Sequence, residues 1–222
     1  MEPARDCSPE RAPEWPSFYA ATADAGPHIT TSLALSLGAI ARSLGDPWAL
    51  DLGCGAGRDA QALLAHGYRV VAVDADTAAI TPLATSLDAE TRARLHLVRS
   101  RFERFKPKRR FAIVNASLAL PFCAPVAFPG LVSSVLEAVQ IGGLFAGHFF
   151  GPNDGWVGTP GQTFLARAEV ASLFEGFEVA LFRETEVDGV DALGRPKHWH
   201  IFGVVARRRE ERSTSTRGRS TP

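Results

Sequence analysis

Short apolar runs alternate with segments of helical periodicity through the middle of the chain. The runs are WALDL at 48–52, YRVVAVD at 68–74, RLHLV at 94–98, FAIVNA at 111–116 and LFAGHFF at 144–150. Between them lie stretches of helical character, among them 58–67 and 128–143. Continuous apolar runs indicate strands buried on both faces, and their alternation with helices predicts a parallel sheet covered on both sides. A further amphipathic helix is predicted ahead of the sheet, from Ile29 to Leu44.

The last third of the chain departs from this alternation. Two strand-like runs at 177–187 and 198–208 are joined by residues 188–197, which are too few and too rich in Gly and Pro for a crossover helix. Strands linked in this way pair antiparallel. The sequence therefore predicts an α/β fold, a doubly wound, mostly parallel seven-stranded sheet with a C-terminal antiparallel hairpin.

Composition sets the limits of the folded part. A chain of 222 residues with 45% hydrophobic content is typical of one globular domain, which we place at residues 17–206. Residues 1–16 hold four prolines and are predicted to be a flexible arm. Residues 207–222 hold six Arg and two Glu and are predicted to be a disordered tail. Because no aromatic residues interleave with these arginines, we expect no nucleic-acid partner.

Cysteine content and hydropathy indicate the compartment. Cys7, Cys54 and Cys123 are too few and too widely spaced for a disulfide framework or a zinc site. No apolar run approaches the ~18 residues of a membrane span, and the N-terminus has no signal-like apolar segment. We therefore expect a cytoplasmic protein without a membrane partner, and the sequence leaves its oligomeric state open.

A glycine-rich loop follows the first predicted strand, in the stretch ALDLGCGAGRDA at 49–60. In doubly wound sheets, ligands bind at the carboxyl ends of the strands beside the first strand. Glycines let the backbone turn sharply and approach a ligand, and the next helix presents its N-terminus there. The dinucleotide pattern G-x-G-x-x-G would require a third glycine at 58, where Arg58 stands. A nucleoside-type cofactor other than a dinucleotide is indicated.

The loop resembles the first motif of the class I S-adenosylmethionine-dependent methyltransferases, hhhDLGCGxG. The carboxylate that ends the next strand resembles the second motif, and the QIGG turn and the terminal hairpin extend the resemblance over about residues 17 to 206. The resemblance implies the cofactor S-adenosyl-L-methionine. The residues implied to bind it are Asp51, Gly53, Cys54, Gly55 and Gly57 at its amino-acid end, Asp74 and Ala75 at the ribose, and Phe102 at the adenine. Arg101 stands where the family usually has an acid.

The expected acceptor is a small molecule. The short chain and its KHWHIFGVVARR ending resemble methyltransferases of the tellurite-resistance and thiopurine type. The D/N-P-P-Y signature of amino-directed nucleic-acid and protein methyltransferases is absent after Asn115. A cofactor-binding module without catalysis is the alternative function, while a nicotinamide dehydrogenase is disfavoured by Arg58 and the hairpin.

Two residues are candidates for catalysis, although methyl transfer depends mainly on aligning donor and acceptor and needs no general base when the acceptor is already an anion or a thiolate. Asn115 stands where the family holds the donor methyl and the cofactor, and its alternative role is a strand-end residue that bonds its own backbone. His148 can act as a base or be a hydrogen-bonded core residue. Cys54 can be a reactive thiol or, as we favour, a small packed residue of the loop.

Other residues are candidates for binding the acceptor. Loop 151–162 can form a lid at the carboxyl edge of the sheet, with Trp156 as an apolar wall and Asp154 as a polar contact, or be an ordinary surface loop. His198 and His200 point to the same face of a strand, where packing or a substrate contact is favoured over a metal. Tyr19 can contact the cofactor or anchor the N-terminal arm. No metal site is predicted.

Overall fold

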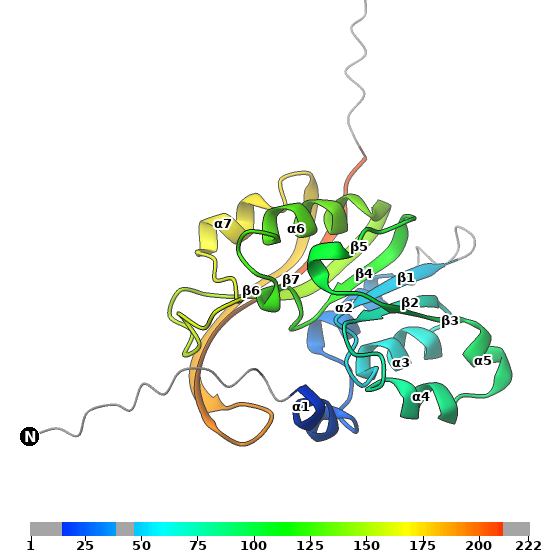
Figure 1. Cartoon of the computed structure of the whole chain (residues 1–222). Coiled ribbons are helices and arrows are strands. Elements are labelled where there is room, and N and C mark those ends of the chain that lie inside the picture. Colours follow the sequence, from blue (N-terminus) through cyan, green and yellow to red (C-terminus); the bar gives the residue numbers. More distant parts are fainter. Residues whose placement is uncertain (1–14, 39–46, 211–222) are drawn as a thin grey trace, which may run out of the picture.

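A seven-stranded sheet forms the centre of the computed structural model, which describes residues 15–38 and 47–210 (Figure 1). The strands lie in the order β3-β2-β1-β4-β5-β7-β6. Strands β1 to β5 pair in parallel, and β7 pairs antiparallel with both β5 and β6. The strands are β1 Trp48–Leu52, β2 Arg69–Asp74, β3 Leu95–Arg99, β4 Phe111–Ala116, β5 Val139–Phe150, β6 Phe177–Val190 and β7 Pro196–Arg208. The predicted fold class is confirmed.

Helices cover both faces of this sheet, as the continuous apolar strands require. Helices α2 and α3 pack on one face, and α6 and α7 pack on the other (Figure 1). The helices are α1 Trp15–Thr22, α2 Ile29–Leu37, α3 Arg58–Ala65, α4 Thr81–Ser86, α5 Ala89–Ala93, α6 Phe128–Glu137 and α7 Arg167–Ser172, with short 3-10 helices η2 Phe102–Arg104 and η3 Leu120–Phe122. Among these described helices none is long and apolar enough to cross a membrane.

The two faces of the sheet build two separate apolar clusters. Along β1, Ala49 packs toward α2 and α3, whereas Leu50 and Leu52 pack toward α6. Every residue of β4 is buried, because this strand lies between β1 and β5 under helices on both sides. Each large side chain buried in this way contributes roughly 1.5–3 kcal/mol. The layered core therefore fixes the carboxyl ends of β1, β2 and β4 at one edge.

The element boundaries differ from the expected ones within the sheet and at the ends of the domain. The predicted helical stretch 128–143 ends with α6 at Glu137, and the QIGG segment predicted as a turn lies in β5, because Val139 already pairs with Phe111 of β4. Helix α1 begins at Trp15, so the expected arm loses its last two residues to a helix. Helix α2 ends at Leu37, and the rest of the predicted helix to Leu44 lies outside the described residues. Strand β7 continues to Arg208, so the expected tail gives its first two residues to the sheet. The remainder of the expected tail from 211 and of the arm up to 14 also lies outside the described residues.

The C-terminal hairpin is longer than the sheet it completes. Strand β5 pairs with β7 only over residues 201–207, while β6 and β7 continue as a two-stranded arm to Val190 and Pro196. In Figure 1 this arm, drawn in orange, curves away from the sheet toward α1. The Arg195 guanidinium at its tip lies 5.4 Å from the centre of the Phe18 ring of α1. The arm and α1 therefore meet over the carboxyl edge of the sheet.

Candidate cofactor and acceptor site

The glycine loop after β1 has the backbone conformation that its sequence predicts. Gly53, Gly55 and Gly57 have φ angles of +71°, +49° and +87°, a region that residues with a side chain rarely adopt. The amides of Gly53 and Cys54 donate to the Val73 carbonyl at 2.8 and 3.0 Å, which ties the loop to β2. A Cβ on Gly55 would lie 2.9 Å from the Tyr19 ring. The absence of side chains at these glycines therefore lets the Tyr19 ring, or a ligand, lie against the loop backbone.

Two neighbouring cavities lie over this loop, with volumes of about 340 and 150 Å³. Both are lined by Trp15, Tyr19, Gly53, Leu118 and Phe122, which separate them. Leu118 has a φ of +50°, a strained conformation of the kind that clusters at functional sites. A larger hollow of about 880 Å³ lies between α6, α7 and the end of β7, but none of the candidate site residues lines it.

The cavity of about 340 Å³, the larger of the two over the glycine loop, is lined by acidic side chains and by an aromatic ring. Asp74, Ala75 and Phe102, all predicted from the sequence, line it. Glu103 lines it as well, one residue beyond Phe102, so the cavity has an acid although Arg101 occupies the position where an acid was expected. The predicted ribose and adenine residues are thus brought together around one space.

Asp74 already accepts hydrogen bonds from three donors. Its Oδ2 accepts from the Gly55 amide at 2.9 Å, and its Oδ1 accepts from the Asp76 amide at 2.9 Å. The Tyr19 hydroxyl donates more weakly, at 3.3 and 3.5 Å from the two oxygens. Burial and the charge of Asp74 raise the pKa of Tyr19 above its usual value, so the hydroxyl keeps its proton. An O–H donor thus lies on the carboxylate that faces the cavity.

Beneath the loop, polar side chains form a buried network around Asn115. Its Nδ2 donates to Asp51 at 2.8 Å and to Asp59 at 3.3 Å. Its Oδ1 accepts from Thr31 and from Ser117, each at 2.9 Å. Asn115 is therefore bonded to side chains rather than to its own backbone, and it joins β4 to the strand, helix and loop beside it.

The side chains of Asp51 and Cys54 are buried, and burial favours their uncharged forms. Burial, with the nearby charge of Asp59, raises the pKa of the Asp51 carboxyl, and its Oδ2 has no hydrogen-bond partner. Burial likewise raises the pKa of the Cys54 thiol well above its usual value. Cys54 still lines the smaller cavity, but as a thiol and not as a thiolate.

The structure pairs two residues that the sequence did not single out, His28 and Asp59. The His28 amide donates to Asp59 Oδ1 at 2.9 Å, and His28 Nδ1 lies 2.7 Å from Oδ2. Burial alone would raise the pKa of Asp59, but the hydrogen bonds and charge of His28 outweigh it and lower the pKa. Both residues line the smaller cavity. A lone histidine before one helix and an acid in the first turn of another gave no sign of this pairing.

His148, on β5, lies beside His28, which precedes α2, and the two ring centres are 5.6 Å apart. Its Nδ1 is covered and has no hydrogen-bond partner. Burial, together with the neighbouring His28, lowers the pKa of His148 to about 3. His148 is therefore neutral at physiological pH and a weak base.

Aromatic rings form most of the wall of the smaller cavity. They come from α1, η3, the end of β5, loop 151–162 and β7, and they are Trp15, Phe18, Tyr19, Phe122, Phe150, Trp156 and Trp199. Trp156, predicted as an apolar wall, is among them. Trp15 and Phe18 lie on α1 with Tyr19. Phe122, Phe150 and Trp199 come from distant parts of the sequence, and nothing in the pattern marked them as neighbours of α1.

Asp154 has a structural position behind this wall. Its carboxylate pairs with Lys197, and both side chains are buried, with exposed fractions of 0% and 1%. It also accepts from the amides of Trp156 at 3.0 Å and of His200 at 3.1 Å. Asp154 therefore holds loop 151–162 against β7 and stands outside the lining of the smaller cavity.

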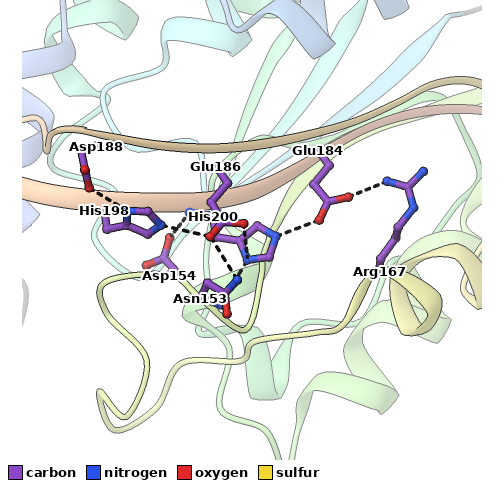
Figure 2. Close-up of polar contacts among 8 residues, drawn as sticks. All are labelled: Asn153, Asp154, Arg167, Glu184, Glu186, Asp188, His198 and His200. Atoms are coloured by element: carbon purple, nitrogen blue, oxygen red, sulfur yellow. Dashed lines mark hydrogen bonds and ion pairs between the residues drawn. The ribbon is translucent and has the colours of Figure 1, made fainter.

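His198 and His200 face β6 (Figure 2). His200 accepts from the Asn153 amide at Nδ1, which leaves Nε2, 3.0 Å from Glu184, as the donor. His198 lies 2.7 Å from Asp188, and this hydrogen bond, with Glu186, raises the pKa of His198. Neither histidine lines the two cavities, and in the described part of the chain no group of three His, Cys, Asp or Glu side chains is arranged to hold a metal.

Comparison with known proteins is consistent with this geometry. Residues 49–143 match a methyltransferase-domain family. No curated protein matches the chain in sequence. All solved structures compared with it below are under 25% identical to the chain, so their likeness shows the fold.

The chain is similar in structure to TehB from Haemophilus influenzae, with a TM-score of 0.62 and 17% identity over 78% of the chain, and it spans only 62% of TehB. A Burkholderia thailandensis 1,6-didemethyltoxoflavin-N1-methyltransferase, crystallised with that compound and S-adenosylhomocysteine, has a TM-score of 0.59 and 19% identity, covering 91% of this chain and 93% of its own. The glycopeptide N-methyltransferase MtfA with S-adenosylmethionine has a TM-score of 0.54 and 20% identity, covering 90% and 100%.

Proposed function

We propose that the chain is a class I S-adenosylmethionine-dependent methyltransferase and that it transfers a methyl group from S-adenosylmethionine to a small-molecule acceptor. One observation carries the proposal. Gly53, the first of the three loop glycines with positive φ, lines a cavity of about 340 Å³ whose wall also holds Asp74 and Phe102.

The residues present fit the cofactor. A nucleoside needs a hydrogen-bond acceptor for its ribose hydroxyls and a flat surface for its base, and the larger cavity offers Asp74 and Phe102. We propose that a ribose hydroxyl replaces the Tyr19 hydroxyl on Asp74, since both are O–H donors. Glu103 is our candidate partner for the adenine amino group, in place of the acid missing at position 101.

The smaller cavity fits the other end of the cofactor. Its wall next to the glycine loop holds one cation, Arg58, and we propose that Arg58 pairs with the carboxylate of the amino-acid end. We propose that Gly53, Cys54 and Gly55, which line this cavity, approach that end through their backbone. Gly57, also predicted as a contact, lines neither cavity, and a Cβ there would meet the Leu83 and Ile80 side chains. We assign Asp51 and Asn115 a positioning role, because both are buried under the loop and reach the cavities only through it.

Alignment is the main contribution of this chain to the reaction. When bound, S-adenosylmethionine supplies the methyl group, and transfer requires the acceptor atom in line with it. Fixing two reactants in that geometry supplies up to ~7–11 kcal/mol. We propose that Leu118 and Phe122, which lie between the two cavities, bring the acceptor to the donor and exclude water. The lowered pKa of His148 makes it a spectator in proton transfer at neutral pH.

The small-molecule assignment rests on the size and polarity of the smaller cavity. A volume of about 150 Å³ with seven aromatic rings in its lining suits the reacting part of a small molecule. Two structural neighbours are named for a toxoflavin precursor and a glycopeptide, which agrees with an acceptor of this kind. We further propose that the enzyme works in the cytoplasm, because Cys54 and Cys123 are free thiols.

Calorimetric titration with S-adenosylmethionine and S-adenosylhomocysteine tests the proposal. The wild type is expected to bind both and not to bind NADH. Asp74→Asn removes the charge of the ribose acceptor and should weaken binding by about 10- to 100-fold, since charge-assisted hydrogen bonds contribute roughly 1.5–3 kcal/mol. Asp76→Asn is the matched control, because Asp76 lines the same cavity and bonds the Ala78 amide instead.

The outcomes separate the alternative functions. Binding of neither cofactor form by the wild type excludes a methyltransferase. Equal losses in the two variants would show that general charge, not Asp74, holds the ribose. Binding without formation of S-adenosylhomocysteine from any acceptor in a screen would favour a cofactor-binding module without catalysis.

A further inference from the structure

The aromatic wall of the smaller cavity is continuous and comes from parts of the chain far apart in sequence. Phe122 lies 4.8 Å from Trp15 and 6.0 Å from Trp156, measured between ring centres. Trp156 lies 6.5 Å from Phe18 and 5.7 Å from Trp199. Most of these contacts are edge-on or tilted, the arrangement in which aromatic rings attract each other and a further ring.

These rings are not simply core residues. Phe150 is buried, but Trp15, Phe18, Phe122, Trp156 and Trp199 each keep part of their surface exposed. They line the same cavity as Gly53 and Leu118, beside the place proposed for the methyl donor. Leaving five large rings partly exposed to water does not stabilise the fold, and apolar surface exposed around a cavity is typical of a ligand-binding site.

The back of the wall is held by a cation that is already neutralised. The Lys197 ammonium lies 4.1 Å from the Trp156 ring centre and 4.2 Å from that of Trp199. Its charge is balanced by Asp154, and both side chains are buried. Because a cation is attracted to the electron-rich face of a ring, the Lys197 ammonium holds the two rings in place. The same rings then attract a second cation, such as a cationic ligand, less strongly. The wall therefore favours a neutral ring over a cationic one.

The charged residues that line the smaller cavity are His28, Arg58 and Asp59, and all lie at the glycine-loop end or in the helix that follows it. Asp59 is engaged by His28, and Arg58 also donates to the Gly26 carbonyl at 2.6 Å. The end of the cavity that the aromatic rings line offers a surface on which the methyl acceptor can stack, and it offers no charged group. At about 150 Å³ the cavity is small. An apolar cavity of roughly this size takes one benzene molecule, so the part of the acceptor that enters it is at most a single ring.

We infer that the methyl acceptor presents a neutral, planar aromatic ring to the space enclosed by Trp15, Phe122, Trp156 and Trp199. The inference rests on the proposed methyltransferase function and narrows its substrate class. The acceptor atom is a substituent or ring atom of that aromatic system, positioned by ring contacts instead of by an ion pair.

The test uses the full chain with bound S-adenosylhomocysteine and three ring-sized probes. Phenol and cyclohexanol share a hydroxyl and a six-membered carbon ring, so only the aromatic character differs, while N-methylpyridinium is planar and cationic. Binding is measured by ligand-observed NMR titration. Phenol is expected to bind about tenfold more tightly than cyclohexanol, and N-methylpyridinium more weakly than phenol.

Two variants locate the probe. Trp156→Leu should remove most of the preference for phenol over cyclohexanol, and S-adenosylhomocysteine binding measured alongside shows whether the site still assembles. Trp48→Leu is the matched control, because Trp48 lies at the amino end of β1, whereas the cavity lies at the carboxyl ends of the strands. Should Trp156→Leu fail to fold, Phe18→Leu on α1 examines the same cavity from its other side.

Each result decides one of the two proposals. Equal binding of phenol and cyclohexanol, with S-adenosylhomocysteine still bound, overturns the aromatic acceptor and leaves the methyltransferase standing. Tighter binding of N-methylpyridinium than of phenol overturns the neutral ring in favour of a cationic one. Loss of the phenol preference in both tryptophan variants places the probe elsewhere and also overturns the inference. Failure of S-adenosylhomocysteine to bind removes the proposed function, and the acceptor assignment with it.

Discussion

Removing the ammonium of Lys197 is expected to destabilise the protein far more than removing a comparable charge nearby. Lys197→Met keeps the length of the side chain but leaves the Asp154 carboxylate buried without its cation. Breaking one partner of a buried ion pair costs about 3–5 kcal/mol. Asp154 would still accept from the amides of Trp156 and His200, which places the expected loss at the lower end of that range.

The control lies on the same hairpin. Arg195 pairs with Asp191 at 2.7 Å, and the exposed fractions of the two side chains are 51% and 3%. Because water reaches the guanidinium and the Asp191 carboxylate also accepts from the amides of Leu193 and Arg195, Arg195→Met should cost less than Lys197→Met, by about 1 kcal/mol or more. The double variant Lys197→Met, Asp154→Asn should lose about 1–3 kcal/mol less than the sum of the single variants, because it leaves no unpaired charge. This coupling separates the ion pair from the packing of the lysine chain.

Urea unfolding followed by far-UV circular dichroism measures these free energies, and thermal unfolding gives an independent check. A loss of about 3–5 kcal/mol corresponds to a melting temperature lower by roughly 6–20 °C in a chain of this size. If Lys197→Met unfolds no more readily than Arg195→Met, the Lys197–Asp154 pair does not hold loop 151–162. The aromatic wall would then have to be fixed by ring packing alone.

Three further variants test the polar residues around the glycine loop. The raised pKa of Asp51 means that the folded state holds its proton while the unfolded state has lost it, so stability falls as pH rises above the ordinary carboxyl range. Asp51→Asn, which mimics the neutral acid, should flatten this decline in urea unfolding between pH 5 and about 8, and an unchanged slope would contradict the assignment. The pKa of His148, lowered to about 3, has the opposite consequence: its share of stability is complete above the ordinary histidine pKa and is lost as pH falls from about 6.5 toward 3. Between about pH 7 and pH 4 the wild type should lose roughly 3 kcal/mol more than His148→Leu, and parallel curves would refute the burial of the ring. Tyr19→Phe removes a hydroxyl that competes with ribose for Asp74, so S-adenosylhomocysteine should bind a few-fold more tightly in calorimetry, whereas weaker binding would make the hydroxyl a direct cofactor contact.

The fold could be predicted because its signals are local. The five apolar runs alternate with helical segments, and four of them became strands with nearly the predicted limits. The fifth, β5, begins five residues before the predicted run, at Val139. The hairpin followed from a short link rich in glycine and proline. What the sequence could not predict was the length of the arm that continues past β5, because the same alternating pattern serves a strand with one neighbour or with two.

The cofactor residues were recognisable because backbone chemistry restricts them. A loop that must adopt positive φ three times needs glycine, and a ribose acceptor needs an acid at a strand end, so Gly53, Gly55, Gly57 and Asp74 could be chosen by type and spacing. Whether each of them contacts the cofactor stays a prediction. His28 and Asp59 could not be chosen, since their pairing depends on how α2 approaches α3.

The aromatic wall shows where sequence reasoning stops for a different reason. A ring contributes to it only if α1, η3, loop 151–162 and the hairpin arm all arrive at the same edge, and none of these placements leaves a local periodicity. Trp156 could be proposed from the sequence because it lies in a loop at the carboxyl edge, where substrates bind in such folds, and its role in binding the acceptor stays a prediction. Trp199 lies on a strand whose alternation indicates only packing. Long-range assembly, not residue type, decides which aromatic residues become a binding surface.

The site divides its chemistry between two ends. Toward β2, backbone amides and the Asp74 carboxylate offer hydrogen bonds, which suit the ribose of the proposed cofactor. Toward the hairpin arm, rings replace charges, and the Lys197 ammonium behind them is already paired with Asp154. Phe18 of α1 and Trp199 of the arm line the smaller cavity alone, whereas Trp15 and Tyr19 of α1 line both cavities. The acceptor specificity of this chain is therefore expected to change with substitutions at Phe18 and Trp199, while cofactor affinity changes with Asp74.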